Sequence, residues 1–267
     1  MKEKDLLSIA KFSEYTGIKQ SVLRHYDEVG LFKPAKRDEN GYRYYSPKQT
    51  ISVNLINVMH NVNIPIKTIK EFTKHRNPGQ ILNLFREQEL SLNRELQRIQ
   101  QAYSIIHIYK AMIYEGLDAN EQEISIRQMA AIPIEIGPVN DFSSGYLYES
   151  YRTFLELMDE RNISSAYPAG GYYEDMDSFI KSNGQPDRYF NHTPNGHDIK
   201  NAGEYLVGYN RGFYGCLGDL PERMKKYADE HQLSFTGPVY EIYLFDEVVI
   251  DDPDQYLIQI SVPVKRP

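Results

Sequence analysis

The chain has 267 residues, of which 41% are hydrophobic, so it can bury a sizeable core and is long enough for two domains. No apolar run approaches the roughly 18 residues that a membrane-spanning helix needs, and residues 1–5 lack the apolar core of a signal peptide. The single cysteine, Cys216, cannot form an internal disulfide. These features argue against a membrane protein and a disulfide-rich secreted domain, and they predict a cytoplasmic protein.

Charge is distributed unevenly along the chain. Lys and Arg number 14 against 8 Asp and Glu over residues 1–77, 4 against 4 over residues 78–115, and 12 against 25 over residues 116–267. A basic first quarter suits a polyanion such as DNA, whereas the acidic remainder suits a cationic ligand. On charge alone, two ordinary solvated surfaces remain the alternative.

Residues 6–29 are predicted to form two short helices separated by a tight turn. Thr16-Gly17 interrupts the first amphipathic stretch, and Ser21 can cap a second helix over Val22–Val29. Two short helices joined at a glycine are typical of a helix-turn-helix, whose second helix enters the major groove of DNA.

A hairpin with cationic strands is predicted directly after these helices. Asn40-Gly41 is a strong turn signal, and the residues on either side supply Lys, Arg and Tyr side chains that can donate hydrogen bonds to phosphates. Ser46-Pro47 indicates the cap and the first residue of a further helix. The segment is therefore predicted to be a winged helix-turn-helix.

This segment resembles the MerR family of bacterial regulators over about residues 6–76. The resemblance is carried by Arg24-His25-Tyr26-Asp27, Gly30-Leu31, Pro34 and Gly41-Tyr42-Arg43-Tyr44-Tyr45, with His25 where the family usually has Tyr. It implies that a recognition helix and a wing hold double-stranded promoter DNA. The DNA-binding residues that it implies are Lys19, Gln20, Arg24, His25, Tyr26, Lys36, Arg37, Tyr42, Arg43 and Tyr45.

Some of these candidates are stronger than others, because a tyrosine can also pack in the core. Arg24 and Arg43 are the better phosphate contacts, because burying an unpaired Arg would be costly. For Tyr26 and Tyr44, packing in the core is the open alternative.

Residues 80–114 contain neither Pro nor Gly and carry an apolar residue every seventh position. The repeat consists of Phe85, Leu92, Ile99, Ile106 and Ile113. Such a heptad predicts a coiled coil of about 50 Å, which needs a partner helix. One long helix packed on its own domain is the alternative. The resemblance implies an antiparallel homodimer through this helix. Such a dimer would present two DNA-binding domains to a pseudo-palindromic operator.

The remaining residues contain an internal repeat with an offset of 70 positions. Asp159–Ser164 matches Asp229–Ser234, and Tyr173 matches Tyr243. The repeat predicts helices over Tyr148–Arg161 and Leu220–His231. It predicts strands over Glu123–Ala131, Ala169–Glu174, Glu204–Tyr209, Val239–Phe245 and Tyr256–Pro263. We therefore expect a pseudo-symmetric α+β domain with a central groove.

This region resembles the effector-binding domain shared by GyrI-like proteins and multidrug-sensing MerR members. The resemblance covers about residues 122–267 and is carried by Tyr209, Gly212-Phe213-Tyr214, Gly237–Tyr243 and Val262-Pro263. It implies that the groove binds a small-molecule effector.

Glu241 is the expected centre of that groove, because it lies in a strand of otherwise apolar and aromatic residues. A carboxylate there is costly to desolvate without a positive partner, and aromatic faces attract cations. In the resembling drug sensors, a Glu of this motif, which maps onto Glu241, neutralises cationic ligands. The candidate walls are Tyr146, Tyr148, Tyr172, Tyr173, Tyr214, Tyr243 and Tyr256. The alternatives for Glu241 are an exposed strand position or a pair with a nearby Arg.

The sequence indicates neither a metal site nor a cofactor. Residues 100–125 contain no cysteine, which argues against a soft-metal sensor. His192, His197 and Asp198 are predicted to be polar loop residues. The chain has no phosphate-cradling Gly motif and no nucleophile elbow, so we expect no catalytic residues.

The sequence thus predicts an α+β multidomain protein. Its expected parts are a winged helix-turn-helix over 1–76, a coiled-coil dimerisation helix over 77–117 and a GyrI-like effector-binding domain over 118–267. The predicted function is that of a regulator, by resemblance an activator, that distorts promoter DNA. It would switch transcription by RNA polymerase when a small, lipophilic cationic or aromatic molecule binds. The alternatives are a hydrolase with Glu241 as the base, and a module that sequesters a compound or a protein partner.

Overall fold

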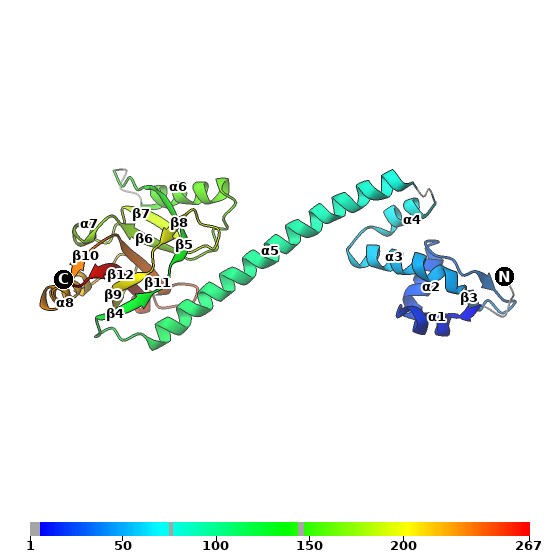
Figure 1. The fold of residues 1–267 in the computed structure, drawn as a ribbon, viewed down its shortest axis with the longest axis horizontal. Coiled ribbons are helices and arrows are strands. Elements are labelled where there is room, and N and C mark those ends of the chain that lie inside the picture. Colours follow the sequence, from blue (N-terminus) through cyan, green and yellow to red (C-terminus); the bar gives the residue numbers. More distant parts are fainter. Residues whose placement is uncertain (1–5, 75–76, 144–146) are drawn as a thin grey trace. The chain divides into compact units, whose positions relative to one another are not determined.

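The computed structural model describes residues 6–74, 77–143 and 147–267, with the backbone alone for 147 and 148. The chain divides into two compact units, residues 1–98 and 99–267. Helix α5 (Pro78–Asp118) begins in the first unit and ends in the second. Figure 1 shows it as one continuous helix.

The first unit is a winged helix-turn-helix, as predicted. Its further elements are β1 (Leu7–Ser8), α1 (Ile9–Thr16), α2 (Gln20–Glu28), β2 (Lys36–Arg37), β3 (Arg43–Tyr45), a 3-10 turn (Pro47–Gln49), α3 (Thr50–Asn61) and α4 (Ile66–Lys74). Gly17 ends α1 with a positive φ of 71°, a conformation that glycine adopts without strain. The predicted Ser21 cap is wrong, because α2 begins at Gln20 with Lys19 at the N-cap position.

The wing forms where the turn signal places it. Strands β2 and β3 pair antiparallel, with Arg37 opposite Arg43, and Gly41 takes a positive φ of 80° in the turn between them. Ser46 then caps the 3-10 turn, in a reciprocal capping box with Gln49, as the sequence indicated.

Helix α5 has 41 residues, so it is about 60 Å long. Its heptad side chains face solvent over the middle of the helix: Leu92 is 45% exposed, Ile99 57% and Ile106 66%. The helix ends at Asp118, one residue after the predicted end of the dimerisation helix at 117. Gly116 is buried in the last turn of the helix, and a Cβ there would lie 2.5 Å from the ring of Phe245.

The second unit is built on an antiparallel sheet in the order β4-β9-β12-β11-β6-β7-β5-β8, with β10 paired to β12. The strands are β4 (Ser125–Met129), β5 (Ile132–Val139), β6 (Ala169–Tyr173), β7 (Arg188–Asn191), β8 (Asp198–Lys200), β9 (Gly203–Arg211), β10 (Ser234–Phe235), β11 (Val239–Phe245) and β12 (Leu257–Lys265). The helices are α6 (Leu147–Glu160), α7 (Met176–Lys181) and α8 (Leu220–Glu230), and a 3-10 turn covers Pro253–Gln255.

The internal repeat corresponds to two copies of a strand-helix-strand-strand unit. The first copy is β5-α6-β6-β7 and the second is β9-α8-β11-β12, whose elements begin 69 to 73 residues later. In the sheet, β6 and β11 lie side by side at the centre, flanked by β7 and β12 and then by β5 and β9. The expected pseudo-symmetry is therefore confirmed.

The sequence located both longer helices and five strands of this unit but missed five helices and strands, the two-residue β10 among them. Strand β5 contains Pro133 and Pro138, which are turn signals in a sequence, and β7, β8 and α7 are short. Short elements carry little periodicity, so sheet pairing and packing in the folded unit determine them rather than local pattern.

The alternation of strand β11 decides what Glu241 faces. Val239 and Tyr243 pack in the cluster that contains α8, whereas Tyr240, Ile242 and Leu244 pack in the cluster that contains the end of α5. Because successive side chains of a strand point to opposite faces, Glu241 lies on the same side as Val239 and Tyr243.

Candidate functional site

A cavity of about 460 Å³ opens in the second unit. It is lined by Tyr109, Tyr151, Ser165, Tyr167, Ala169, Gly170, Gly171, Gly184, Pro186, Tyr189, Tyr214, Gly215, Glu241, Tyr243, Asp246, Glu247 and Val248. Within the part of the chain that the structure describes, this lining contains six tyrosines and three carboxylates but no Lys, Arg or His. The size suits a drug-sized molecule, and the lining favours an aromatic cation.

A glycine gives the Glu241 carboxylate its space. Glu241 lies directly opposite Gly171 in the pairing of β11 with β6. A Cβ at Gly171 would lie 3.1 Å from Oε2 of Glu241 and 3.0 Å from Cβ of Pro186. Under the 70-residue repeat, Gly171 is the counterpart of Glu241, so one copy supplies the carboxylate and the other leaves room for it.

Tyrosine hydroxyls are the partners of this carboxylate. Tyr173 donates a hydrogen bond of 2.5 Å to Oε2, and Tyr243 donates a second one. Glu241 is 3% exposed, and no ion pair to it is present among the described residues. Burial raises the pKa of Glu241, and the two tyrosine hydrogen bonds oppose this only in part. Neither alternative from the sequence holds, because Glu241 is neither exposed nor paired with Arg.

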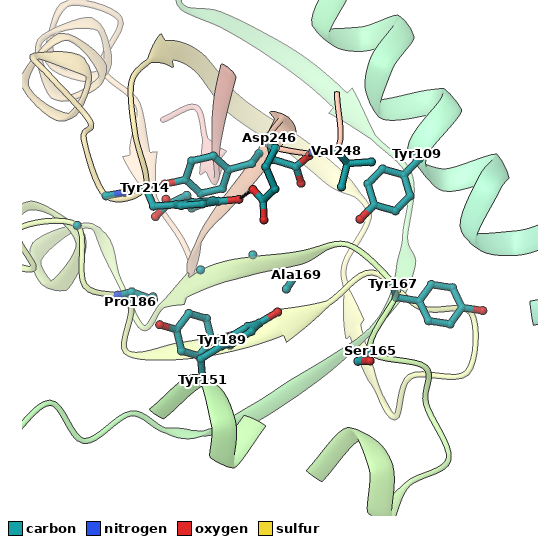
Figure 2. A pocket seen from close by; sticks show the side chains of 17 residues that line it. Tyr109, Tyr151, Ser165, Tyr167, Ala169, Pro186, Tyr189, Tyr214, Asp246 and Val248 are labelled. Carbon is teal, nitrogen blue, oxygen red and sulfur yellow. Dashed lines mark hydrogen bonds between the residues drawn. The ribbon is translucent and has the colours of Figure 1, made fainter. Parts of the chain in front are cut away.

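Aromatic side chains stand on two sides of the cavity. Figure 2 shows Tyr214, Asp246, Val248 and Tyr109 along one side and Pro186, Tyr189, Tyr151, Ser165 and Tyr167 along the other. The Tyr151 and Tyr189 rings meet edge to face at 5.2 Å, as do those of Tyr214 and Tyr243 at 4.6 Å. Such walls can hold a flat or ring-bearing ligand between them.

The predicted ligand residues fall into three groups. Glu241, Tyr214 and Tyr243 line the cavity, and Tyr173 lies outside its lining but donates to Glu241. Tyr146 lies outside the described residues, as does the side chain of Tyr148.

Tyr172 and Tyr256 do not line the cavity, which corrects the prediction for both. Tyr172 follows Gly171 on β6 and therefore points to the opposite face, where its ring packs edge to face on Tyr240 at 5.7 Å. Tyr256 is buried behind the wall, with its ring 5.4 Å from that of Tyr214.

Sequence reasoning missed six tyrosines and carboxylates of the lining. These are Tyr109, Tyr151, Tyr167, Tyr189, Asp246 and Glu247. Tyr109 lies on α5, which the sequence predicted only as a dimerisation helix, and Tyr189 lies on β7, which was not predicted. The available signal was the acidic pair directly after the strand that carries Glu241.

The predicted DNA-contacting residues lie mostly on the surface of α2 and the wing. Lys19, Arg24, His25, Lys36, Arg37 and Tyr42 are exposed, and Gln20 and Arg43 are partly exposed. Between α2 and the wing lies a hollow of about 280 Å³ lined by Ile9, Arg24, Asn40, Gly41, Tyr42 and Arg43. Its two arginines could grip a phosphate group.

A buried carboxylate ties the wing to α2. Oδ2 of Asp27 accepts hydrogen bonds of 2.5 Å from both Arg37 and Arg43. Burial alone would raise the pKa of Asp27, but the hydrogen bonds from Arg43 and Arg37 lower it below its usual value. The wing is therefore held to α2 by a satisfied carboxylate.

Tyr26 and Tyr45 lie in the core of the first unit, which corrects the prediction that they contact DNA. Both are 0% exposed. Tyr45 stacks on Phe12 at 4.7 Å, and the Tyr26 hydroxyl lies 3.4 Å from Oδ1 of Asn57. Their apolar rings sit better in the core than in solvent, as the alternative for Tyr26 had allowed.

His192 and His197 of the second unit lie in loops, as predicted. His192 is largely buried, which lowers its pKa to about 4, and His197 Nδ1 lies 2.7 Å from Oε2 of Glu135. Asp198 begins β8 rather than lying in a loop. Among the described residues no three His, Cys, Asp or Glu side chains come together as metal ligands. Over the same residues, no helix combines the length and apolar character that crossing a bilayer requires.

Comparison with known proteins places the first unit in a family. Residues 7–75 match the model of the MerR HTH family regulatory proteins. The chain carries a MerR-family helix-turn-helix domain. The "Transcriptional regulator BrlR" of Pseudomonas aeruginosa is 37% identical to this chain over 65 residues, which are 24% of each chain.

Two relatives are similar over nearly the whole chain. The "Multidrug-efflux transporter 2 regulator" of Bacillus subtilis is 23% identical over 270 residues, 98% of each chain. The "Multidrug-efflux transporter 1 regulator" of the same organism is 24% identical over 282 residues, 96% of this chain and 97% of the other. The likeness therefore extends beyond the MerR-type domain to the long helix and the unit that holds the cavity.

Proposed function

We propose that the chain is a transcription regulator that responds to a small lipophilic cation. The observation that carries the proposal is the Glu241 carboxylate, which lines a drug-sized cavity, is buried among tyrosines and forms no ion pair within the described part of the chain. A cation would supply the missing charge and stack on the tyrosine rings. The relatives that regulate multidrug-efflux transporters support this ligand class.

The MerR-type domain would bind double-stranded promoter DNA. Arg24 and Arg43 in the hollow between α2 and the wing would contact phosphates, and α2 would enter the major groove. The exposed heptad positions of α5 would pair with the same helix of a second chain, so that two DNA-binding domains contact a pseudo-palindromic operator. Binding of the ligand would favour one arrangement of the dimer, distort the promoter and alter its use by RNA polymerase.

The ligand proposal is tested by calorimetry with tetraphenylphosphonium and its anionic counterpart tetraphenylborate, which share size and shape. We expect the cation to bind and the anion to fail, and we expect Glu241→Gln to weaken cation binding at least about tenfold. Glu230→Gln, which removes an exposed carboxylate of α8, is the matched control and should bind as the wild type does. Equal binding of the cation by Glu241→Gln and the wild type would overturn the proposal.

The DNA proposal is tested on the fragment upstream of the chain's own gene by fluorescence anisotropy. Arg24→Ala should weaken binding about tenfold and reduce its dependence on salt, because one phosphate contact is lost. Arg86→Ala removes an exposed arginine on α5 and serves as the control. Equal losses in both variants would show that overall charge, not the hollow, determines the affinity.

A further inference from the structure

We propose that Gly215 is a positioning residue for cation recognition, because its backbone N–H orients the Tyr243 hydroxyl so that this hydroxyl donates to Glu241. The inference rests on the proposed function of the cavity and adds the loop that orients one of its donors. This loop covers residues 212–218, between β9 and α8. Gly215, Tyr243 and Glu241 all line the cavity.

A chain of two hydrogen bonds connects this loop to the carboxylate. The N–H of Gly215 donates to the hydroxyl oxygen of Tyr243 over 2.7 Å, and that hydroxyl donates to Glu241. A backbone N–H can only donate, whereas a tyrosine hydroxyl can both donate and accept. Gly215 therefore occupies the accepting side of the Tyr243 oxygen and leaves its one proton for the carboxylate. Hydrogen bonds linked in this way strengthen each other.

The direction of the Tyr243 hydroxyl decides which form of Glu241 it favours. A hydroxyl that donates to a carboxylate stabilises the ionised form, whereas one that accepts from a protonated carboxyl group stabilises the neutral form. Burial raises the pKa of Glu241, and the hydrogen bond from Tyr243 opposes that rise. By keeping the hydroxyl a donor, the N–H of Gly215 favours the ionised carboxylate, which is the form that attracts a cation.

Other groups around Glu241 do not take over this task. Besides Tyr243, the titratable groups around it are Tyr173 of β6, Tyr189 of β7, and Asp246 and Glu247 after β11. Tyr173 also donates to the carboxylate, but within the residues that the structure describes no backbone N–H donates to Tyr173. The Tyr243 hydroxyl is thus the donor whose direction the backbone determines.

The loop is built to bring a backbone N–H to Tyr243. Gly215 has a positive φ of 77°, and a Cβ there would lie 3.1 Å from the carbonyl oxygen of Gly184. A side chain at this position would therefore be both strained and crowded. The next residue is held as well, because the side chain of Asn210 donates to the carbonyl oxygen of Cys216 over 3.0 Å.

Replacing the backbone amide of Gly215 by an ester tests the inference. Glycolic acid at this position, introduced into the full chain by nonsense suppression, exchanges the N–H for an oxygen and adds no side chain. We expect calorimetry with tetraphenylphosphonium to show a threefold to fivefold loss of affinity, roughly, at neutral pH. The rise of affinity with pH should also lie at higher pH than in the wild type, because the ionised form of Glu241 has lost support.

The matched control is the same replacement at Gly218, in the same loop. Its N–H donates no hydrogen bond among the described residues. The Gly218→glycolic acid variant should therefore bind the cation as the wild type does, with the same dependence on pH. Thermal melting checks that both ester variants are folded.

Tyr243→Phe shows whether the N–H of Gly215 acts through the hydroxyl. In this background there is no hydroxyl to orient, so the ester at Gly215 should leave the affinity for tetraphenylphosphonium unchanged. An ester effect of the same size with and without the Tyr243 hydroxyl would overturn the inference, since the loop would then affect only the shape of the cavity.

The outcomes separate this inference from the proposed function. If tetraphenylphosphonium binds in a Glu241-dependent way and the Gly215 ester variant binds it as tightly as the wild type, the positioning role is refuted and the cation cavity stands. If tetraphenylphosphonium does not bind the wild type, both proposals are refuted.

Discussion

Asp27 in the MerR-type domain and Glu241 in the second unit are both buried carboxylates, and they differ in what surrounds them. Asp27 accepts hydrogen bonds from Arg37 and Arg43, which lower its pKa. Glu241 accepts hydrogen bonds from Tyr173 and Tyr243, and burial raises its pKa. Asp27 therefore has two cationic partners, whereas the partners of Glu241 within the described residues are neutral hydroxyl groups.

Under the proposed function, this difference separates a structural carboxylate from one that binds a ligand. Desolvating a carboxylate is unfavourable unless a cation accompanies it, so a fold tolerates an unpaired one only at some loss of stability. Glu135, in the same unit as Glu241, shows that this unit can supply partners, because it is fully buried and paired with Arg161. Glu241 has no such cationic partner among the described residues, and under the proposed function the ligand would supply one.

The largest effect is expected from Asp27→Asn, which removes the charge that holds the wing. The variant should lose about 2 kcal/mol of stability, mostly through Arg43, because Arg37 is half-exposed and screened by solvent. Thermal unfolding followed by circular dichroism measures the loss.

The pH dependence of that loss follows from the lowered pKa of Asp27. The stabilisation is present above the unfolded pKa of about 3.9 and disappears as the pH falls through the lower folded value. Glu28→Gln, the exposed neighbour on α2, is the control. If Asp27→Asn and this control melt at the same temperature, the charge of Asp27 does not stabilise the fold.

Gly171→Ala tests whether the Glu241 carboxylate needs its open neighbour. The added Cβ would crowd both Oε2 of Glu241 and Pro186, so cation affinity should fall several-fold, up to about tenfold. Gly203→Ala, at the start of β9, is the matched control because nothing lies within 4 Å of its Cβ. Calorimetry with tetraphenylphosphonium measures both affinities. Equal affinities of Gly171→Ala and Gly203→Ala for the cation would contradict the account.

Glu241→Gln should make the protein more stable, opposite in sign to Asp27→Asn. Because the folded pKa of Glu241 is raised, ionisation destabilises the fold as the pH rises above the unfolded value of about 4.3. The variant should melt a few degrees higher at neutral pH and match the wild type below about pH 4. A lower melting temperature at neutral pH would show that Glu241 stabilises the fold.

Tyr173→Phe is the smallest change, because it removes one of two hydroxyl donors to Glu241. The ionised carboxylate loses some support, so cation affinity at neutral pH should fall about threefold to fivefold. Tyr172→Phe alters the neighbouring residue on the opposite face and should leave the affinity unchanged. An equal response of the two variants would exclude a positioning role for Tyr173.

The sequence predicts this architecture well where a segment carries a clear turn signal or a long periodic pattern. The helix-turn-helix, the Asn40-Gly41 wing, the long helix and β11 all carry strong periodicity or turn signals. Glu241 was found because a charge stands out in an apolar strand.

The rest of the site depends on contacts that no local pattern encodes. Tyr109 comes from the long helix, Tyr189 from a four-residue strand and Tyr151 from α6, and the sheet order brings them together. Asp27 was seen as part of a family motif, but its pairing with two wing arginines emerges only from the fold. Tyr26 and Tyr45 were misassigned because a tyrosine in a basic segment can serve the core or the surface.

The most direct test of the account is cation affinity as a function of pH. For tetraphenylphosphonium, the account predicts that affinity for the wild type rises with pH as Glu241 ionises, and that this rise lies above the usual carboxyl range because burial raises the pKa of Glu241. In Glu241→Gln the affinity should be lower and independent of pH across the range of this rise. The same pH dependence in the wild type and in Glu241→Gln would contradict the claim that Glu241 is the carboxylate that binds the cation.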